Sequence, residues 1–103
     1  MNFFEVIITP EAENDLWEIR NYIADILLEP DTAREYIDDI NEKIEKLEYM
    51  ADTIAPVPDE PWYSRKIRKL PAKEFFIYYQ INENRHYVFV ISIIYKKEIK
   101  TEF

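Results

Sequence analysis

The stretch HYVFVISIIY, residues 86–95, decides how the C-terminal half of this chain folds. Its apolar run over residues 87–95 has polar relief only at Ser92, which is typical of a strand covered on both faces. We therefore predict that this run is the central strand of a sheet. The run FFIYYQI, residues 75–81, precedes it across the turn NENR, so the two should form an antiparallel hairpin. The run RKIRKL, residues 65–70, predicts a further strand before the turn PAKE, giving a three-stranded meander over residues 65–95.

The N-terminal half combines one strand with two helices. Residues 1–9 contain the β-branched and aromatic run FFEVIIT, which predicts a strand. Residues 10–51 carry apolar residues at steps of three and four, interrupted at LEPDTA, and this spacing predicts a hairpin of two antiparallel helices. Thr9 is suited to cap the first helix, and Pro10 and Pro30 fit the first turns of the two helices. Residues 52–64 hold three prolines and predict an extended linker, and residues 96–103 form a tail.

The predicted elements make one domain over residues 1–103, with an α+β fold of order β-α-α-β-β-β. In this fold the helical hairpin packs on one face of a mostly antiparallel four-stranded sheet. The chain has no cysteine and no glycine, which excludes a thiolate metal site and a glycine-rich phosphate loop. We expect no metal, no cofactor and no membrane segment, a cytoplasmic location, and turns made by Pro, Asn and Asp.

Charge is divided unevenly along the chain. Residues 1–60 carry 17 acidic and 4 basic side chains, a net charge of −13, whereas residues 61–103 carry 9 basic and 4 acidic side chains, a net charge of +5. Four cations fall within five positions: Arg65, Lys66, Arg68 and Lys69. Such a cluster is either a solvated edge strand or a patch that faces phosphate. A second basic cluster after residue 95 favours the phosphate-facing patch.

Four segments, in this order and at these spacings, resemble the RelE/ParE superfamily of bacterial toxins from type II toxin–antitoxin pairs. They are VIITPEAENDLWEIRNYI, VPDEPW, IRKLPAKEFFIYYQI and VFVISIIYKKE. The resemblance implies an antitoxin partner whose hydrophobic segment fills an apolar groove between sheet and hairpin. RelE-like members cut messenger RNA in the ribosome, and ParE-like members inhibit DNA gyrase without catalysis. The paired basic clusters favour RelE-like cleavage here, and gyrase inhibition or a non-toxic interaction module of the same fold are the alternatives.

The resemblance also implies positions for the site. The residues that match the catalytic positions of RelE-like nucleases are Arg68, Lys69, Lys97 and Tyr95. Supporting contacts to RNA phosphate fall to Arg65, Lys66, Lys96 and Lys100. We expect Arg68 and Lys69 both to face solvent, and Tyr95 to hydrogen-bond or stack on a base. Two positions depart from the nuclease pattern, since Phe76 stands where those enzymes have arginine and Phe103 where they have a C-terminal tyrosine.

Overall fold

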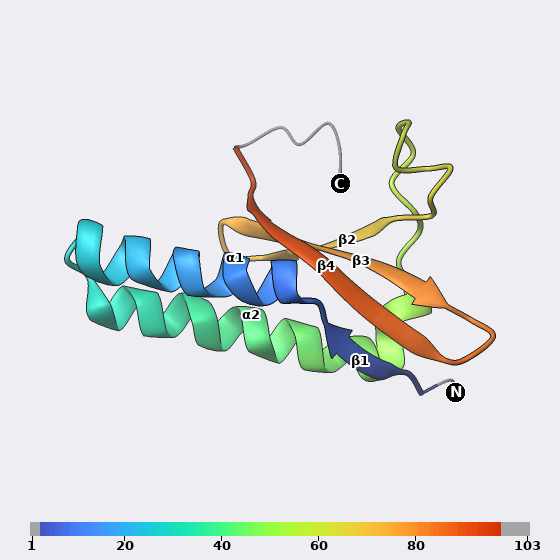
Figure 1. Cartoon of the computed structure of the whole chain (residues 1–103), viewed down its shortest axis with the longest axis horizontal. Coiled ribbons are helices and arrows are strands. Elements are labelled where there is room, and N and C mark those ends of the chain that lie inside the picture. Colours follow the sequence, from blue (N-terminus) through green and yellow to red (C-terminus); the bar gives the residue numbers. More distant parts are fainter. Residues whose placement is uncertain (1–2, 98–103) are drawn as a thin grey trace.

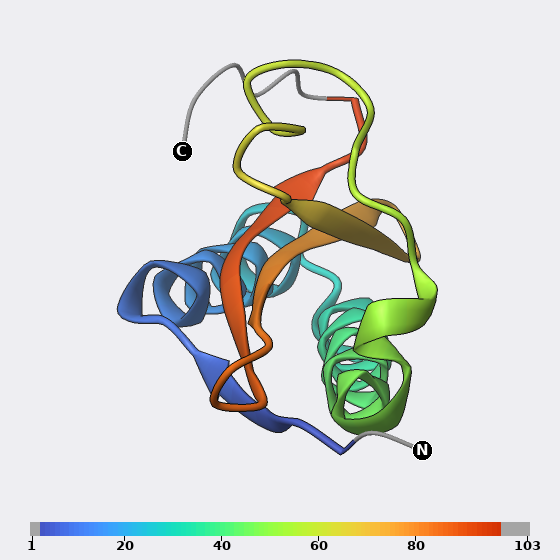
Figure 2. The same cartoon turned by 90° about the vertical axis from the view of Figure 1, so that its right-hand side faces the viewer.

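The computed structural model describes residues 3–97 and confirms the predicted fold class. The elements are β1 (Glu5–Ile8), α1 (Pro10–Asn21), the π-helical turn η1 (Tyr22–Ile26), α2 (Pro30–Met50), the 3₁₀ turn η2 (Ala51–Thr53), β2 (Arg68–Ala72), β3 (Phe75–Asn82) and β4 (Tyr87–Tyr95). The sheet order is β1-β4-β3-β2, with β1 parallel to β4 and the other pairs antiparallel. Both helices lie on the same face of the sheet (Figures 1 and 2). The opposite sheet face is called the open face below.

Strand β4 lies between β1 and β3, which confirms its predicted central position. The expectation that it is covered on both faces is wrong, because both helices lie on one face of the sheet and Tyr87 and Phe89 on the other face are only partly buried. Its pairing with β3 changes register where Tyr78 faces Ser92 and Tyr79 faces Val90, so Ile91 is an extra residue in a β-bulge. Beside this bulge the Asp15 carboxylate accepts hydrogen bonds from Ser92 Oγ at 2.9 Å and from Ile93 N at 3.0 Å. Asp15 therefore joins α1 to the irregular part of β4.

The helix signals in the sequence act as expected. Thr9 caps α1, because its Oγ1 accepts from Ala12 N at 3.3 Å, and Pro10 and Pro30 begin the two helices. Apolar residues of α2 then pack on the sheet, with Ile40 and Leu47 fully buried. They form one core with Ile77, Tyr79, Val88 and Val90 from β3 and β4. None of the described helices is long and apolar enough to cross a membrane.

The turns differ from the expectation that Pro, Asn and Asp would make them. Four other residues take left-handed backbone conformations with φ between 54° and 57°: Leu28, Lys66, Lys73 and His86. Glycine is the usual residue at such positions, because any Cβ raises their energy. A chain without glycine therefore carries backbone strain at each of these four turns.

The predicted strand over residues 65–70 is displaced along the sequence. Strand β2 begins at Arg68 and continues through Pro71 and Ala72, which were expected in a turn. Residues 65–67 instead close a turn in which Ile67 N donates to Trp62 O at 3.0 Å and Lys66 N donates to Tyr63 O at 3.0 Å. Pro71 is tolerated because β2 is an edge strand.

Candidate functional site

The four clustered cations are separated by the turn that precedes β2. Arg65 and Lys66 are exposed on this turn, and Lys66 has a φ of 54°. Arg68 and Lys69 lie on β2, where neighbouring side chains point to opposite faces. The expectation that all four cations lie on one strand is therefore wrong.

Arg68 points toward the end of the helical layer and is half-buried. Its Nη1 donates to Ile54 O at 2.5 Å and to Asp52 O at 3.4 Å. Its cross-strand partner Tyr79 is fully buried and donates from Oη to Ala51 O at 2.8 Å. Together these side chains satisfy carbonyls of the segment that follows α2, where a cation is also favoured by the helix dipole. The expectation that Arg68 faces solvent is wrong, because Arg68 lies on the same side of β2 as the buried Leu70.

Burial raises the pKa of Tyr79 to about 12, with Arg68 lowering it and Asp52 raising it by smaller amounts. The hydroxyl therefore keeps its proton at neutral pH and remains a hydrogen-bond donor. Burial also raises the pKa of Tyr78, the next residue on β3.

Lys69 has the opposite environment and lies on the open face. Its Nζ is 4.4 Å from the ring centroid of Phe76, and Lys96 Nζ is 5.4 Å from the same centroid. Phe76 also contacts Tyr78 edge-on, with the centroids 6.3 Å apart. Two cations are thus held on one aromatic ring. We call Lys69, Phe76, Tyr78 and Lys96 the open-face cluster.

A hollow of about 480 Å³ lies next to this region and is called the open-face hollow. Its lining combines Arg65, Lys66 and Arg68 with Gln80, Ile81, Asn82, Glu83, Asn84 and Phe89. Gln80 Nε2 donates to Arg65 O at 3.0 Å, which joins the turn before β2 to β3. The hollow therefore combines three cations and three amides with one carboxylate, that of Glu83, and this mainly cationic lining suits an anionic ligand.

Tyr95, another of the predicted catalytic residues, lies on the helical side of the sheet. Its ring centroid is 5.6 Å from that of Phe75, which in turn is 6.2 Å from the Tyr36 ring of α2. Lys97 is exposed just after β4. Lys100 and Phe103 lie outside the described residues.

Tyr95 lines a second hollow, of about 570 Å³, between the helical hairpin and the ends of β3 and β4. We call it the hairpin hollow. It is lined by Glu18, Ile19, Tyr22, Ile23, Leu27, Glu29, Thr32, Tyr36, Glu74, Phe75 and Tyr95. Most of these side chains are apolar, and the three charged ones are all glutamates.

The structure thus brings Lys69 and Lys96 together on the Phe76 ring. Arg65, Lys66 and Arg68 line the open-face hollow, although Arg68 Nη1 is engaged with the carbonyls of Asp52 and Ile54. Tyr95 lies apart from both groups, in the lining of a different hollow. Phe76 and Tyr78 were not expected to take part in a site. The alternation within FFIYYQI could have indicated them, because Phe76, Tyr78 and Gln80 share one strand face. On the helical side, Phe75, Ile77 and Tyr79 are buried.

Solved structures of two toxin–antitoxin systems have a similar fold. One is described as the chromosomal ParDE toxin–antitoxin system from P. aeruginosa, with a TM-score of 0.73 and 22% identity over 90% of this chain and 96% of that chain. The other is the RelBE2 toxin–antitoxin complex from Mycobacterium tuberculosis, with a TM-score of 0.65 and 14% identity over 90% of this chain and 98% of that chain. No curated protein matches the sequence. The chain therefore shares its fold with these two structures.

The sequence itself assigns the family. Residues 6–99 match the family described as the ParE toxin of the type II toxin–antitoxin system, parDE. This match covers most of the chain, from β1 to just beyond β4. The chain belongs to the ParE toxin family.

Proposed function

We propose that this toxin acts by binding and inhibiting DNA gyrase, and that it does not cut messenger RNA. The observation that carries the proposal is the separation of the predicted catalytic residues. Arg68 is engaged with backbone carbonyls on the helical side, Lys69 lies on the open face, and Tyr95 lines the hairpin hollow. A single phosphate could not contact all three.

Cleavage by attack of the 2′-hydroxyl needs a base for that hydroxyl, cations for the phosphate and an acid for the leaving oxygen. The two lysines of the open-face cluster supply positive charge and Phe76 cannot titrate, so Tyr78 is the member that remains as a candidate base. Burial raises the pKa of its hydroxyl. It therefore keeps its proton at neutral pH and is a poor base. The cluster supplies cations and aromatic surface, which are means of binding.

Membership in the ParE family supports gyrase as the target, because the resemblance implies that ParE-like members inhibit this enzyme. The open-face cluster suits a protein target, since aromatic side chains such as Tyr78 are enriched where binding energy concentrates at interfaces. Lys69 and Lys96 are exposed, and Phe76 and Tyr78 are half-buried. Their removal should weaken binding without disturbing the core.

A cognate antitoxin is the second partner that we propose. The hairpin hollow is the apolar groove that such a partner would fill, and burial of its side chains by the antitoxin would stabilise the toxin by mass action. Growth arrest on expression of this chain alone, and recovery when the neighbouring reading frame is coexpressed, would support the toxin role. Normal growth with abundant folded protein would contradict it.

The proposed target has its own test in the messenger RNA of arrested cells. Primer extension on ribosome-bound messenger should show intact transcripts after expression of the toxin. The double variant Lys69→Glu/Lys96→Glu should lose growth arrest and keep its fold, whereas Arg20→Glu, an exposed change on α1, should retain arrest. Transcripts cut at defined positions by the wild type and left intact by the double variant would favour the RelE-like nuclease instead.

A further inference from the structure

We propose that the hairpin hollow selects an antitoxin segment whose apolar side chains are flanked by lysine or arginine. This inference rests on the toxin role proposed above and adds the chemistry of the partner segment. It follows from three features of the hollow: its acidic rim, its apolar lining, and the exposed apolar residues at the hairpin tip.

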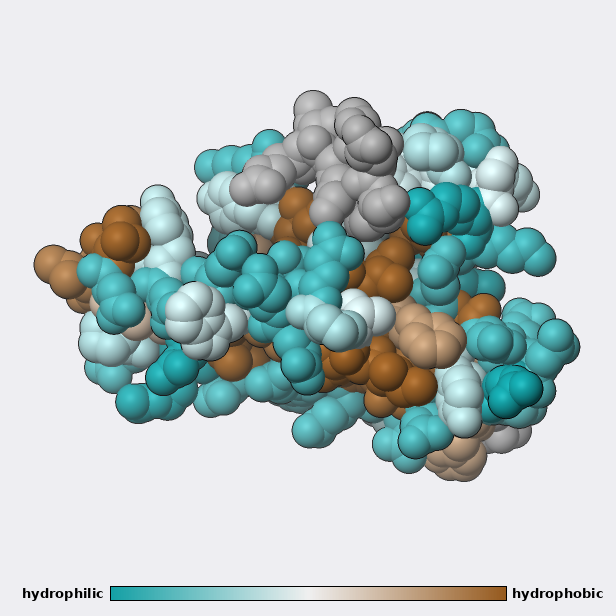
Figure 3. Space-filling model, in the orientation of Figure 1, coloured by the Kyte–Doolittle hydropathy of each residue, from teal (hydrophilic) through white to brown (hydrophobic). Residues whose placement is uncertain are grey.

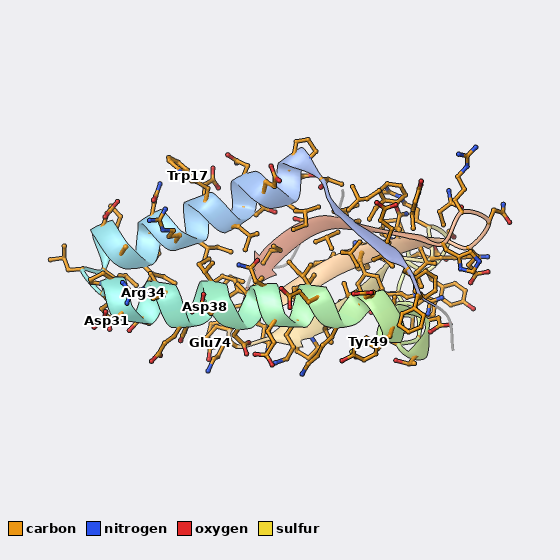
Figure 4. The ribbon with its side chains drawn as sticks, turned by 90° about the horizontal axis from the view of Figure 1, so that it is seen from below. Trp17, Asp31, Arg34, Asp38, Tyr49 and Glu74 are labelled. Atoms are coloured by element: carbon orange, nitrogen blue, oxygen red, sulfur yellow. The ribbon has the colours of Figure 1, made fainter. Side chains whose placement is uncertain are left out.

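The rim of the hairpin hollow carries three carboxylates. Glu18, Glu29 and Glu74 line the hollow, and within residues 3–97 none of them forms an ion pair. Glu18 Oε1 accepts from Asn14 Nδ2 at 3.1 Å, and Glu29 Oε1 accepts from Thr32 Oγ1 at 3.4 Å. Both donors are neutral, so the negative charge of each carboxylate is retained. Figure 4 shows Glu74 alongside α2, and it lines the hollow together with Thr32 and Tyr36 of that helix.

The lining beneath this rim is apolar and formed by three separate parts of the chain. Ile19 and Ile23 come from the first helical segment, Tyr36 from α2, and Phe75 and Tyr95 from the sheet. The hollow of about 570 Å³ has room for a few aliphatic side chains of a partner. A partner with no apolar side chains would leave this lining in water.

The hairpin tip extends the apolar surface beyond the hollow. Ile26 and Leu28 are 68% and 78% exposed, and Tyr22 and Leu27 at the rim are 56% and 46% exposed. The brown surface at the left end of Figure 3 lies over this tip. Contiguous exposed apolar side chains of this kind mark interaction surfaces on small proteins.

Leu28 gives independent support, because it is unfavourable for the isolated fold in two ways. It occupies the left-handed position just after a helix, with φ 57°, where glycine is the usual residue. Its large apolar side chain is also mostly exposed. A strained backbone and an exposed leucine at one position indicate that its side chain serves binding.

Charge complementarity fixes the kind of segment that fits. Lysine or arginine beside the apolar anchors would meet Glu18, Glu29 and Glu74, whereas acidic side chains would meet like charge. The open-face hollow has the opposite preference, since its charged lining consists of three cations and a single carboxylate, that of Glu83. A basic, apolar segment is therefore directed to the hairpin hollow and an acidic segment to the open face.

The test uses overlapping peptides of about 15 residues that tile the product of the neighbouring reading frame, a length that spans about 22 Å as a helix. We expect the tightest peptide that protects the hairpin hollow to carry apolar residues and a net positive charge. The double variant Glu18→Lys/Glu29→Lys should weaken its binding about tenfold, and Leu28→Gly should weaken it while stabilising the free toxin. Glu45→Lys, an exposed reversal elsewhere on α2, should leave binding unchanged. Exchanging the peptide cations for glutamates should restore binding to the double variant.

The inference is overturned if the hollow binds a neutral or acidic peptide, if the double variant binds like Glu45→Lys, or if free toxin proves to be a dimer through this hollow. These results are independent of the toxin role. The rim variants, expressed without antitoxin, should arrest growth like the wild type. If the wild type arrests no growth but binds the basic peptide, the proposed function fails and the charge preference stands.

Discussion

Replacing Arg68 with methionine tests whether this arginine stabilises the fold, in contrast to the neighbouring Lys69, which we expect to serve binding. Methionine keeps most of the apolar stem but cannot donate to Ile54 O and Asp52 O, which Arg68 holds at 2.5 and 3.4 Å. A hydrogen bond from a charged donor contributes about 1.5–3 kcal/mol, and the longer contact is weak, so we expect Arg68→Met to cost about 2 kcal/mol. For a domain near 100 residues this lowers the melting temperature by roughly 8–16 °C.

Lys69→Met is the matched control, because Lys69 lies on the opposite face of β2, where its Nζ contacts the Phe76 ring. Its cation–π contact with Phe76 is exposed, and its loss should cost about 0.5 kcal/mol. Guanidinium unfolding followed by far-ultraviolet circular dichroism measures both variants against the wild type. Growth arrest should show the opposite order, with Lys69→Met weakened in activity and Arg68→Met active wherever it remains folded. Equal stability of the two variants would refute the assignment of Arg68 to the carbonyls after α2.

Three further variants test how the scaffold is held. Tyr79→Phe should lose about 1–2 kcal/mol at pH 8 by leaving Ala51 O unsatisfied, as chemical denaturation would measure. In the wild type the pKa of the Tyr79 hydroxyl, about 12, exceeds the unfolded value near 10, so its stabilisation is complete below pH 10 and is lost as pH rises toward 12. A difference in stability between wild type and Tyr79→Phe that stays constant from pH 8 to pH 11.5 would count against this. Lys73→Gly should stabilise by roughly 0.5–1 kcal/mol because it relieves a φ of 54°, and a lower melting temperature would show that no strain is stored there. Asp15→Asn should cost about 1–2 kcal/mol, since Oδ2 of the carboxylate accepts from both Ser92 and Ile93 and a neutral amide oxygen makes weaker hydrogen bonds than a charged one; unchanged thermal unfolding would disprove that role.

Most of the fold could be predicted because its signals are local and agree with one another. Thr9, Pro10 and Pro30 locate the helix starts, and the apolar run before Tyr95 identifies the central strand. The start of β2 was harder to place, because RKIRKL repeats the same polar-polar-apolar triplet in the turn, residues 65–67, and in the strand, residues 68–70. The hydrogen bond from Ile67 N to Trp62 O, which keeps residues 65–67 out of the strand, depends on the linker.

The candidate site could be predicted as a region but not as an arrangement of side chains. Counting cations found the basic C-terminal half, yet clustering in sequence gives no information on which face a residue occupies. The register in which β2 pairs with β3 decides that Arg68 faces the helical layer and Lys69 the open face. The bulge at Ile91 places Tyr95 opposite Phe75, in the hairpin hollow and away from Lys69. These facts depend on strand pairing, which local patterns do not determine.

The acidic hairpin shows a similar limit. The notable feature in the sequence was the excess of negative charge, which is spread over solvated helix faces such as that bearing Asp31 and Arg34, an ion pair at 3.7 Å (Figure 4). Only the fold shows that Glu18, Glu29 and Glu74, far apart in sequence, line one hollow. Trp17 projects from α1 on the side away from α2 and takes no part in it (Figure 4).

The most direct test of the proposed action is a supercoiling assay with purified gyrase, relaxed plasmid and increasing concentrations of the toxin. We predict dose-dependent inhibition by the wild type and by Arg20→Glu, loss of inhibition in Lys69→Glu/Lys96→Glu, and recovery of supercoiling when the antitoxin is added. Full supercoiling activity at a saturating concentration of folded wild-type toxin would contradict the account.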